Sequence, residues 1–394
     1  MTICEKEKCS GCAACRDICP KDCITMQEDE YGVIYPKVDD NKCIHCGLCK
    51  KTCPNLKPVE RKKPEKCYAA YQTDTEVRKN SASGGIAADL YKQFINKHSG
   101  IIYGVCSEND HVTFKEGSVI ADIERFKGSQ YTQADSVGVY QSIEKNLRQG
   151  KPVLFIGCPC QVAGCLSYMS NKKLSTDNLF TIDLLCHGVS PQKYLKEELK
   201  YLSEKYGWEE YSKVTFRTNK PGENYQFSVR YRKKGEKNYS EYHNPVLFSP
   251  YFCAFLFNTS LRESCFHCKY SSFERTGDLT IGDFIGLASQ KKYPEYKYEK
   301  KNTSIIFVNS PKGKLLCEEL DEKILMIERP IEEGYTSAPR MNGASEPSKY
   351  RRKFLKLYPK YGFTVACKKS QRMFTIESRI KQIIKKVIGY DKKR

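Results

Sequence analysis

The chain has 394 residues, of which 40% are hydrophobic and 29% are charged, which is ordinary for a globular protein. The formal net charge of +19 indicates anionic partners, and 21 cysteines indicate a reducing compartment. No apolar run is long enough to span a bilayer, and no signal segment opens the chain, so we expect a cytoplasmic protein.

Two cysteine runs with the same spacing dominate the start of the chain. Each reads C-x2-C-x2-C-x3-C and is followed by a proline, Pro20 in the first run and Pro54 in the second. Loops this tight place three thiolates around one point, which suits an iron–sulfur cubane and strains most disulfides. Zinc sites use separated cysteine pairs, so zinc is the weaker alternative. The doubled run is the signature of bacterial two-cluster ferredoxins.

This signature predicts two [4Fe-4S] clusters with crossed ligands, because the fourth cysteine of each run ligates the other cluster. The first cluster is expected to have the ligands Cys9, Cys12, Cys15 and Cys53. The second is expected to have the ligands Cys43, Cys46, Cys49 and Cys19. Cys4 and Cys23 lie outside both runs and are expected to be thiols without a ligand role.

The rest of the chain alternates between strand and helix patterns. Residues 55–66 are rich in proline and charge and are expected to be a linker. The β-rich runs are residues 67–71, 100–106, 151–157, 179–186, 213–217, 226–232 and 303–308. The helical patterns are residues 85–97, 141–149, 161–169 and 192–206. We therefore predict an α+β chain, with a bacterial-type two-cluster ferredoxin domain at 1–58, a larger mixed α/β domain with a buried sheet at 67–365, and a tail at 366–394.

Two polar loops have residues suited to a phosphate-bearing cofactor. The stretch SASGG follows Arg78 and enters a predicted helix, whose free N–H groups favour a phosphate. An ordinary serine N-cap explains SASGG equally well, and the stretch is not the G-x-G-x-x-G fingerprint. The stretch KGSQY, from Lys127 to Tyr131, is either a cover for a planar cofactor or a solvated loop.

Further cysteines lie on three later segments. GCPCQVAG contains Cys158 and Cys160, LLCHGVSP contains Cys186, and CFHCKY contains Cys265 and Cys268. Thiolates from these loops can hold a third cluster. Zinc and buried unligated cysteines are the alternatives that the spacing leaves open.

The stretches SASGG, KGSQYTQ, GCPCQVAG, CHG, LRESCFHCKY and GDLTIGDFIG occur in this order behind the ferredoxin module. Together they resemble the coenzyme F420 hydrogenase/dehydrogenase beta-subunit family over residues 1 to about 310. The resemblance implies that the larger domain binds flavin and a third iron–sulfur cluster. The common family motif is G-T-P-C-Q, which matches Cys160 rather than Cys158, and Ile285 stands where G-D-F-W-G has tryptophan.

The resemblance also implies roles for individual residues. The third [4Fe-4S] cluster would have the ligands Cys160, Cys186, Cys265 and Cys268. The phosphates of FAD would be held by Ser81, Ser83, Gly84 and Gly85, with Arg78 nearby. The isoalloxazine or its tail would be lined by Lys127, Gly128, Ser129 and Tyr131. His187 and Asp283 are the candidate catalytic residues, with tuning of the adjacent ligand cysteine and turn capping as their respective alternatives.

The implied function is electron transfer between a hydride carrier and iron–sulfur clusters. A flavin accepts two electrons as a hydride and releases them one at a time. The implied partners are a redox protein or ferredoxin and a small-molecule hydride donor or acceptor, with no specific nucleic acid. A non-catalytic iron–sulfur electron-transfer subunit is the alternative, and a nucleic-acid binder is suggested by charge alone.

The end of the chain lies beyond the resemblance and has a basic amphipathic pattern. Its apolar stripe consists of Ile376, Ile380, Ile383, Ile384, Val387 and Ile388. Its basic residues are Arg379, Lys381, Lys385 and Lys386. The pattern predicts a helix that either packs on the protein's own core or docks to a partner or to a membrane surface as a peripheral contact.

Overall fold

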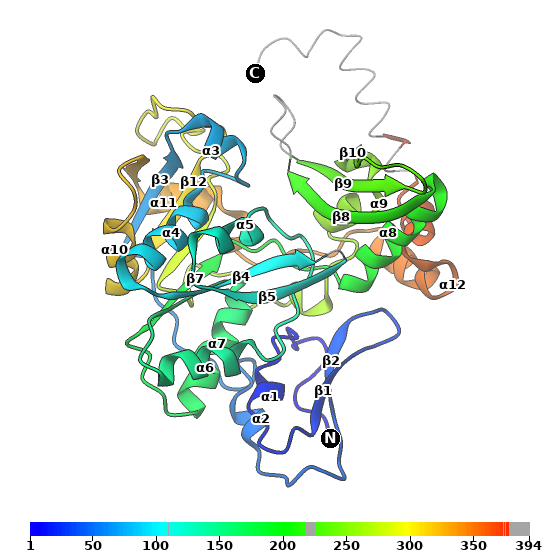
Figure 1. Cartoon of the computed structure of the whole chain (residues 1–394), viewed down its shortest axis with the longest axis horizontal. Helices are drawn as coiled ribbons and strands as arrows, with labels where there is room; N and C mark the ends of the chain where they lie inside the picture. Colours follow the sequence, from blue (N-terminus) through cyan, green and yellow to red (C-terminus); the bar gives the residue numbers. More distant parts are fainter. Residues whose placement is uncertain (109, 218–224, 373, 375, 378–394) are drawn as a thin grey trace.

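A small N-terminal module lies at one end of a larger body that contains a broad mixed sheet and a smaller sheet (Figure 1). The computed structural model describes residues 1–108, 110–217, 225–372, 374, 376 and 377. The module contains an antiparallel hairpin of β1 (Ile24–Glu28) and β2 (Ile34–Val38). This architecture confirms the predicted α+β class with an N-terminal ferredoxin-like domain.

The two cysteine runs fold as similar loops within the module. Each contains a helical turn, α1 (Ala14–Asp17) in the first run and α2 (Leu48–Lys51) in the second. The residues before these turns, Ala13 and Gly47, have φ angles of 63° and 74°. A left-handed residue between two cysteines bends the loop back on itself, at a cost of about 1 kcal/mol for alanine. Such strain is typical of segments that are shaped to hold a ligand.

The broad sheet has the strand order β13-β3-β12-β11-β7-β6-β4-β5. Its strands are β3 (Lys66–Gln72), β4 (Ile101–Glu108), β5 (His111–Gly117), β6 (Val153–Gly157), β7 (Leu179–Leu184), β11 (Leu279–Asp283), β12 (Ser304–Val308) and β13 (Ile324–Arg329). The central strands β11, β7, β6 and β4 run parallel, and antiparallel strands flank them on both sides. Parallel strands bring their carboxyl ends to one edge, where sites in α/β sheets commonly form.

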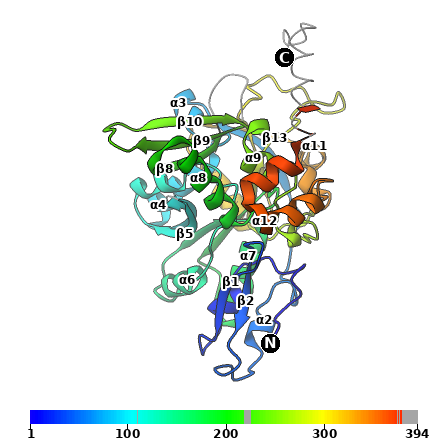
Figure 2. The same ribbon diagram turned by 90° about the vertical axis from the view of Figure 1, so that its right-hand side faces the viewer.

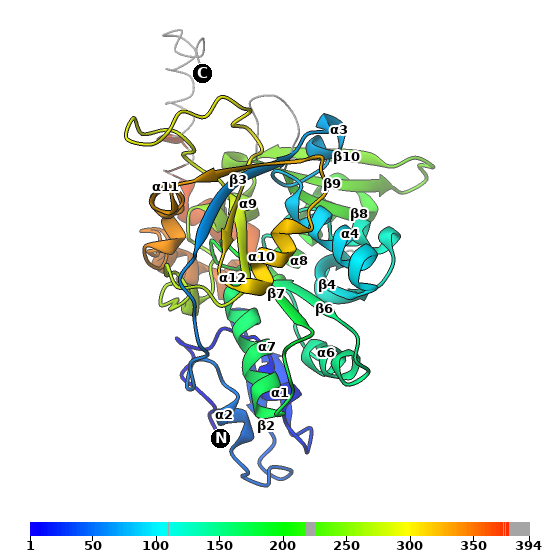
Figure 3. The same ribbon diagram turned by 90° about the vertical axis from the view of Figure 1, so that its left-hand side faces the viewer.

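Helices cover both faces of the broad sheet. One face packs on α4 (Ile86–His98) and α10 (Pro311–Glu318). The other packs on α6 (Val139–Arg148) and α7 (Pro159–Asn171). Helix α7 extends toward the module, where α1 packs against it (Figure 3). The same apolar core includes Ile18 of the module, so the module and the body share a continuous interior.

The smaller sheet is antiparallel and has the order β10-β9-β8. Its strands are β8 (Trp208–Arg217), β9 (Tyr225–Lys233) and β10 (Ser240–Pro245). An aromatic core joins it to α8 (Gln192–Tyr206), α9 (Pro250–Leu256) and α12 (Arg351–Ser370), as Figure 2 shows. The strands predicted at 213–217 and 226–232 therefore form, but they do not join the broad sheet.

The remaining helical segments are short: α3 (Thr75–Lys79), η1 (Ile120–Asp122), α5 (Ile123–Phe126), η2 (Val246–Phe248), η3 (Glu263–Cys265), α11 (Ile331–Ser337) and η4 (Pro339–Met341). Across the described parts of the chain, no helix combines the length and apolar character needed to cross a membrane.

The connector and the tail differ from their predicted forms. Lys62 and Arg275 exchange two backbone hydrogen bonds of 2.8 Å, so the connector at 55–66 is fixed to the body rather than free. Helix α12 continues to Ser370 with Cys367 buried, and thus crosses the tail boundary placed at residue 366. The amphipathic stripe and its basic residues lie almost entirely at 378–394, outside the described residues. Ile376 is described and is 40% exposed.

Candidate functional site

The motif cysteines of the module lie in two groups. The first cysteine group lines a small cavity together with Cys4: Cys9, Cys12, Cys15 and Cys53. The second cysteine group lines another cavity together with Cys23: Cys19, Cys43, Cys46 and Cys49. In each group three cysteines come from one run and the fourth comes from the other run. Crossed cluster ligation requires this arrangement.

The two thiols outside the motif lie against these groups, which the spacing of the runs did not indicate. The Cys4 thiol hydrogen-bonds those of Cys9 and Cys53, and this lowers their pKa values to about 6 and about 7. The sulfur of Cys23 lies 3.3 Å from that of Cys19. Because the thiolate is the form that binds metal, the hydrogen bonds from Cys4 favour the ligand form of two cysteines in the first group.

The first and second cysteine groups differ in exposure. All ligand candidates of the first group are buried, whereas Cys46 of the second group is exposed. The first group faces the body: a Cβ built on Gly164 of α7 would lie 3.1 Å from the sulfur of Cys12. The second group thus lies toward solvent and the first toward the interior.

A third cysteine group forms where three segments of the body meet. Its members are Cys158, Cys160, Cys186, Cys265 and Cys268. The first two lie at the start of α7, Cys186 follows β7, and the others lie at and after η3. Burial and the neighbouring thiols raise the pKa of Cys160 well above its ordinary value. A bound cation that favours thiolates would offset this cost.

The donor set of the third group fits an iron–sulfur cluster, because soft thiolates from separate loops are the usual ligands of such clusters. The group has one thiol more than a cluster needs, and Cys158 hydrogen-bonds Cys186. In the described ranges, no three His, Cys, Asp or Glu side chains form a group that could hold a metal ion. Gly188 allows the segments to approach, since its φ is +131° and a Cβ there would lie 3.4 Å from that of Cys265.

The first and third groups are neighbours in the interior. The thiols of Cys12 and Cys160 interact electrostatically. Tyr270 is 5% exposed, and its hydroxyl has no hydrogen-bond partner among the described residues. The thiols that act on this hydroxyl are Cys160, Cys12, Cys268 and Cys53, which belong to the two groups. The Lys269 ammonium donates to the carbonyl of Pro54, which also ties the two regions together.

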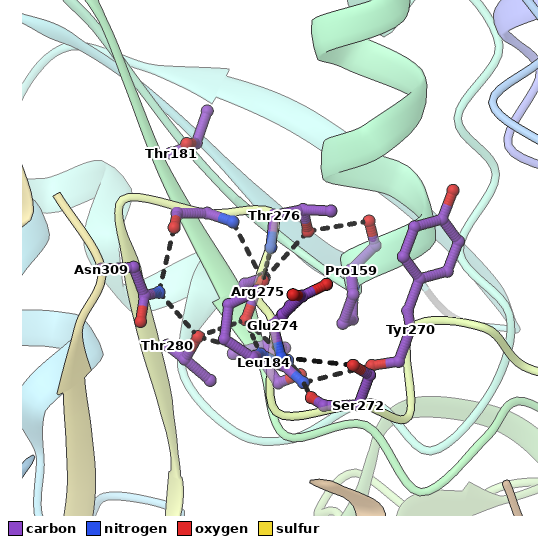
Figure 4. Close-up of polar contacts among 12 residues, drawn as sticks. Pro159, Thr181, Leu184, Tyr270, Ser272, Glu274, Arg275, Thr276, Thr280 and Asn309 are labelled. Carbon is purple, nitrogen blue, oxygen red and sulfur yellow. Dashed lines mark hydrogen bonds and ion pairs between the residues drawn. The ribbon is translucent and has the colours of Figure 1, made fainter. Parts of the chain in front are cut away.

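A buried ion pair fixes the sheet edge next to the third group. Arg275 donates to Asp183 with an Nη2–Oδ1 distance of 2.7 Å, and both side chains are almost fully buried. Arg275 Nη1 also donates to the carbonyl of Tyr270 at 3.2 Å, while the tyrosine ring points away from this network (Figure 4). Thr276 donates to Asp183 through both its N–H and its hydroxyl. The end of β7 and the segment after Cys268 are therefore locked together.

A cavity of about 580 Å³ lies at the carboxyl ends of β6, β7 and β11. Its size is typical of sites for small molecules and cofactors. Nine of the predicted cofactor and catalytic residues line it: Ser81, Ser83, Gly85, Lys127, Gly128, Ser129, Tyr131, His187 and Asp283. Cys158 and Cys186 line it too, so one wall of the cavity belongs to the third cysteine group.

The start of α4 forms one end of this cavity. Gly85 is the N-cap with φ of 84°, and no side chain caps the helix. Ser81 instead donates to the carbonyl of Val77 at 2.9 Å, so the serine N-cap interpretation of SASGG is wrong. A helix start without a capping side chain at a cavity wall is a suitable phosphate site.

Two predicted phosphate contacts do not line the cavity. A Cβ on Gly84 would lie 2.4 Å from the carbonyl oxygen of Ala70 in β3, so this glycine is needed for packing against the sheet. The Arg78 guanidinium stacks 4.4 Å from the ring centroid of Tyr71.

A polar cluster forms the wall of the cavity next to the smaller sheet. Arg217, at the end of β8, pairs with Asp283 at 2.5 Å and donates to the Tyr131 hydroxyl at 2.8 Å. Its guanidinium also lies 4.3 Å from the ring centroid of Tyr225. Sequence reasoning missed Arg217 and Tyr225, because a basic residue and an aromatic residue in two strands carry no motif.

His187 lines the cavity as a neutral imidazole. Burial lowers its pKa to about 4, and the adjacent Arg340 guanidinium acts in the same direction. Arg340 lies 3.1 Å from Nδ1, which assigns Nδ1 as the acceptor and places the proton on Nε2. Nε2 is buried and has no partner among the described residues. The ring therefore offers one unpaired hydrogen-bond donor.

Comparisons with known proteins match two parts of the chain. Residues 150–333 match the family described as the C terminus of the beta subunit in coenzyme F420 hydrogenase/dehydrogenase. Residues 8–56 match the "4Fe-4S dicluster domain" family.

Individual relatives match mainly at the module. An uncharacterized ferredoxin of Methanocaldococcus jannaschii is 37% identical over 67 residues, which are 16% of this chain and 86% of that protein. One component of the Na(+)-translocating ferredoxin:NAD(+) oxidoreductase complex of Acetobacterium woodii is 44% identical over 64 residues, 15% of this chain and 18% of that one. A chain of the F420-reducing [NiFe] hydrogenase complex from Methanosarcina barkeri is 16% identical with a TM-score of 0.44, covering 72% of this chain and 90% of that chain. By its two family matches, the chain belongs to the coenzyme F420 hydrogenase/dehydrogenase beta-subunit family and carries an N-terminal 4Fe-4S dicluster domain.

Proposed function

We propose that this chain is an oxidoreductase that moves electrons between a small-molecule hydride carrier in the cavity and the clusters of the module. From the module they pass to a redox protein or a ferredoxin. One observation carries the proposal: Cys158 and Cys186 belong both to the cavity wall and to the third cysteine group. That group in turn adjoins the first cysteine group through Cys12. The cavity and the cysteine groups therefore form one continuous series.

The residues of the cavity fit FAD as its cofactor, which would supply a group that exchanges electrons in pairs with a hydride carrier and singly with clusters. The start of α4, with Ser81, Ser83 and Gly85, offers N–H and hydroxyl donors to the phosphates. Lys127 adds positive charge at the same cavity. Gly84 and Arg78 support this wall from behind instead of contacting the phosphates.

The other walls provide groups that can orient a bound molecule. The Nε2–H of His187 can donate a hydrogen bond to a ligand acceptor, because nothing else in the described chain occupies it. Asp283 holds the Arg217 guanidinium at the wall, and this cation suits a carrier with an anionic group. These contacts bind and orient a ligand beside the third cysteine group.

The second cysteine group supports transfer to a protein partner. Cys46 and Ile44 are exposed, with Ile44 56% exposed, so a cluster held there would lie close to the protein surface. The net charge of +19 suits an acidic redox protein.

The test is anaerobic reconstitution of the full chain with iron, sulfide and FAD, followed by rapid mixing with reduced deazaflavin, NADH or NADPH. We expect one FAD per chain, bleached by one of these carriers, and subsequent bleaching of the clusters. In the Cys265→Ser/Cys268→Ser variant, the flavin should still be reduced while reduction of the module clusters slows. A chain that assembles its clusters, binds no flavin and takes electrons only from proteins would instead be a non-catalytic electron-transfer subunit.

A further inference from the structure

Arg262 crosses the junction between the module and the body. It precedes η3, and its side chain is fully buried at 0% exposure. Nε donates to the carbonyl of Cys9 at 2.7 Å, and Nη1 donates to Gln133 Oε1 at 3.1 Å. The guanidinium also lies 4.6 Å from the ring centroid of Tyr35 in the module.

The module is shaped to receive this guanidinium. Gly11 lies in the loop between Cys9 and Cys12 and has a φ of +68°. A Cβ on Gly11 would lie 2.9 Å from Nη1 of Arg262 and 2.4 Å from the amide nitrogen of Gln133. The loop that surrounds the first cysteine group therefore closes over the arginine only because it has no side chain at this position.

Arg262 differs from other buried arginines in its partners. Arg275 pairs with Asp183 at 2.7 Å (Figure 4), and Arg329 pairs with Glu333 at 2.8 Å. For Arg262, no carboxylate of the described residues lies within ion-pair distance, and its buried Nη2 has no hydrogen-bond partner there. A guanidinium keeps its charge inside a protein, so burial at this place requires an anion.

The anions available at this place are cysteine thiolates. The charge of Arg262 acts on the thiol of Cys9 in the first group and on that of Cys265 in the third. A [4Fe-4S] cluster with four thiolates carries a net charge of about −2, and its reduction adds one more negative charge. A cation fixed nearby in a low-dielectric interior stabilises the more negative, reduced form.

We propose that Arg262 is the counterion of the cluster held by the first cysteine group, and that it raises the reduction potential of this cluster. The inference rests on the cluster sites of the proposed function. It makes the first cluster a favourable acceptor for electrons that leave the third cysteine group, while the exposed second cluster lacks this cation.

The test compares Arg262→Gln with Arg262→Lys in the full chain, reconstituted anaerobically. Redox titration followed by electron paramagnetic resonance gives the midpoint of each cluster, and iron analysis gives the cluster content. In the glutamine variant, the oxidation–reduction equilibrium of one cluster should shift at least about tenfold toward the oxidised form, which is about 59 mV for one electron. The lysine variant, which keeps the charge but not the paired hydrogen bonds, should stay near the wild-type midpoint.

Arg351→Gln is the matched control. Arg351 anchors the same segment, donating to the carbonyl of Leu261 at 2.8 Å and pairing with Glu263. Its loss should lower stability and leave every midpoint unchanged. Loss of the cluster in the glutamine variant alone, with lysine intact, also supports the proposal. Equal behaviour of the glutamine and lysine variants, or unchanged midpoints in both, would overturn it. The iron content of the wild-type chain tests the cluster sites separately.

Discussion

Cys12 and Gly164 are in close contact across the junction between module and body. A Cβ on Gly164 would lie 3.1 Å from the Cys12 sulfur and 2.8 Å from the Tyr140 hydroxyl. Helix α7 carries Gly164 one turn beyond Cys160 of the third cysteine group. The absence of a side chain at residue 164 therefore sets how closely the first and third groups approach.

Gly164→Val should separate these groups. The added methyl groups force α7 and the Cys12 loop apart, so stability should fall by about 1–3 kcal/mol, as is usual for overpacking. Reduction of the module clusters by electrons from the cavity should slow. Rapid-mixing spectroscopy and denaturant unfolding measure the two effects. A less stable variant with an unchanged rate would remove this contact from the electron path.

The iron content should reveal the third cysteine group directly. We expect about twelve irons per chain, since each cubane has four. Cys265→Ser with Cys268→Ser should lower the content by about four irons and leave the module signals intact. Cys106→Ser is the control, because Cys106 is buried in β4 and belongs to none of the three groups. An iron content of about eight in the wild-type chain would contradict a third cluster.

The single variants Cys158→Ser and Cys160→Ser should differ. The family motif places the ligand at Cys160, while Cys158 hydrogen-bonds Cys186 at the cavity wall. We therefore expect loss of the third cluster in the Cys160 variant only. Iron analysis of both proteins decides between the two thiols, and the opposite result would exchange their roles.

Ser83→Asp should remove FAD without harming the fold. Ser83 lines the cavity just before α4, where a negative charge favours the helix dipole but repels a phosphate. Ser83→Asn is the uncharged control of similar size. Flavin retention after gel filtration, together with the thermal unfolding midpoint, measures both effects. Equal flavin content in the aspartate and asparagine variants would place the phosphates elsewhere.

The stability of the chain should depend on pH through Glu198. This residue is 1% exposed on α8, and burial raises its pKa from 4.5 to about 7. Between these pH values the folded chain holds a proton that the unfolded chain releases, so stability is highest below pH 4.5 and falls as pH rises toward 7. The loss amounts to about 3 kcal/mol by pH 7. Denaturant unfolding of the wild type and of Glu198→Gln over this range should show the slope only in the wild type.

The sequence predicted local elements well because their signals are local. The buried strands at 151–157 and 179–186 and the helix at 192–206 follow hydrophobic patterns that their own residues define. The smaller sheet was missed as a separate layer because α12, from residues 351–370, covers it. No pattern within 213–232 reports a helix that lies more than one hundred residues away in the chain.

The candidate site was predictable to a similar degree. Cysteine spacing indicated the crossed groups, since ligand loops must bend in a set way. The ordered motifs named most residues that line the cavity. Arg217, Tyr225 and Arg262 were missed as partners because strand pairing and the junction with the module, rather than sequence neighbours, bring them to their positions.

The crossed arrangement of the first two cysteine groups has a consequence for assembly. Cys53 closes the first group and Cys19 closes the second, so each cluster would join the two loops to each other. Once one cluster binds, the loop that carries ligands of the other is already held in place, and less chain entropy is lost in the second step. Cluster insertion into the module should therefore be cooperative, with apo and doubly loaded chains in excess over singly loaded ones.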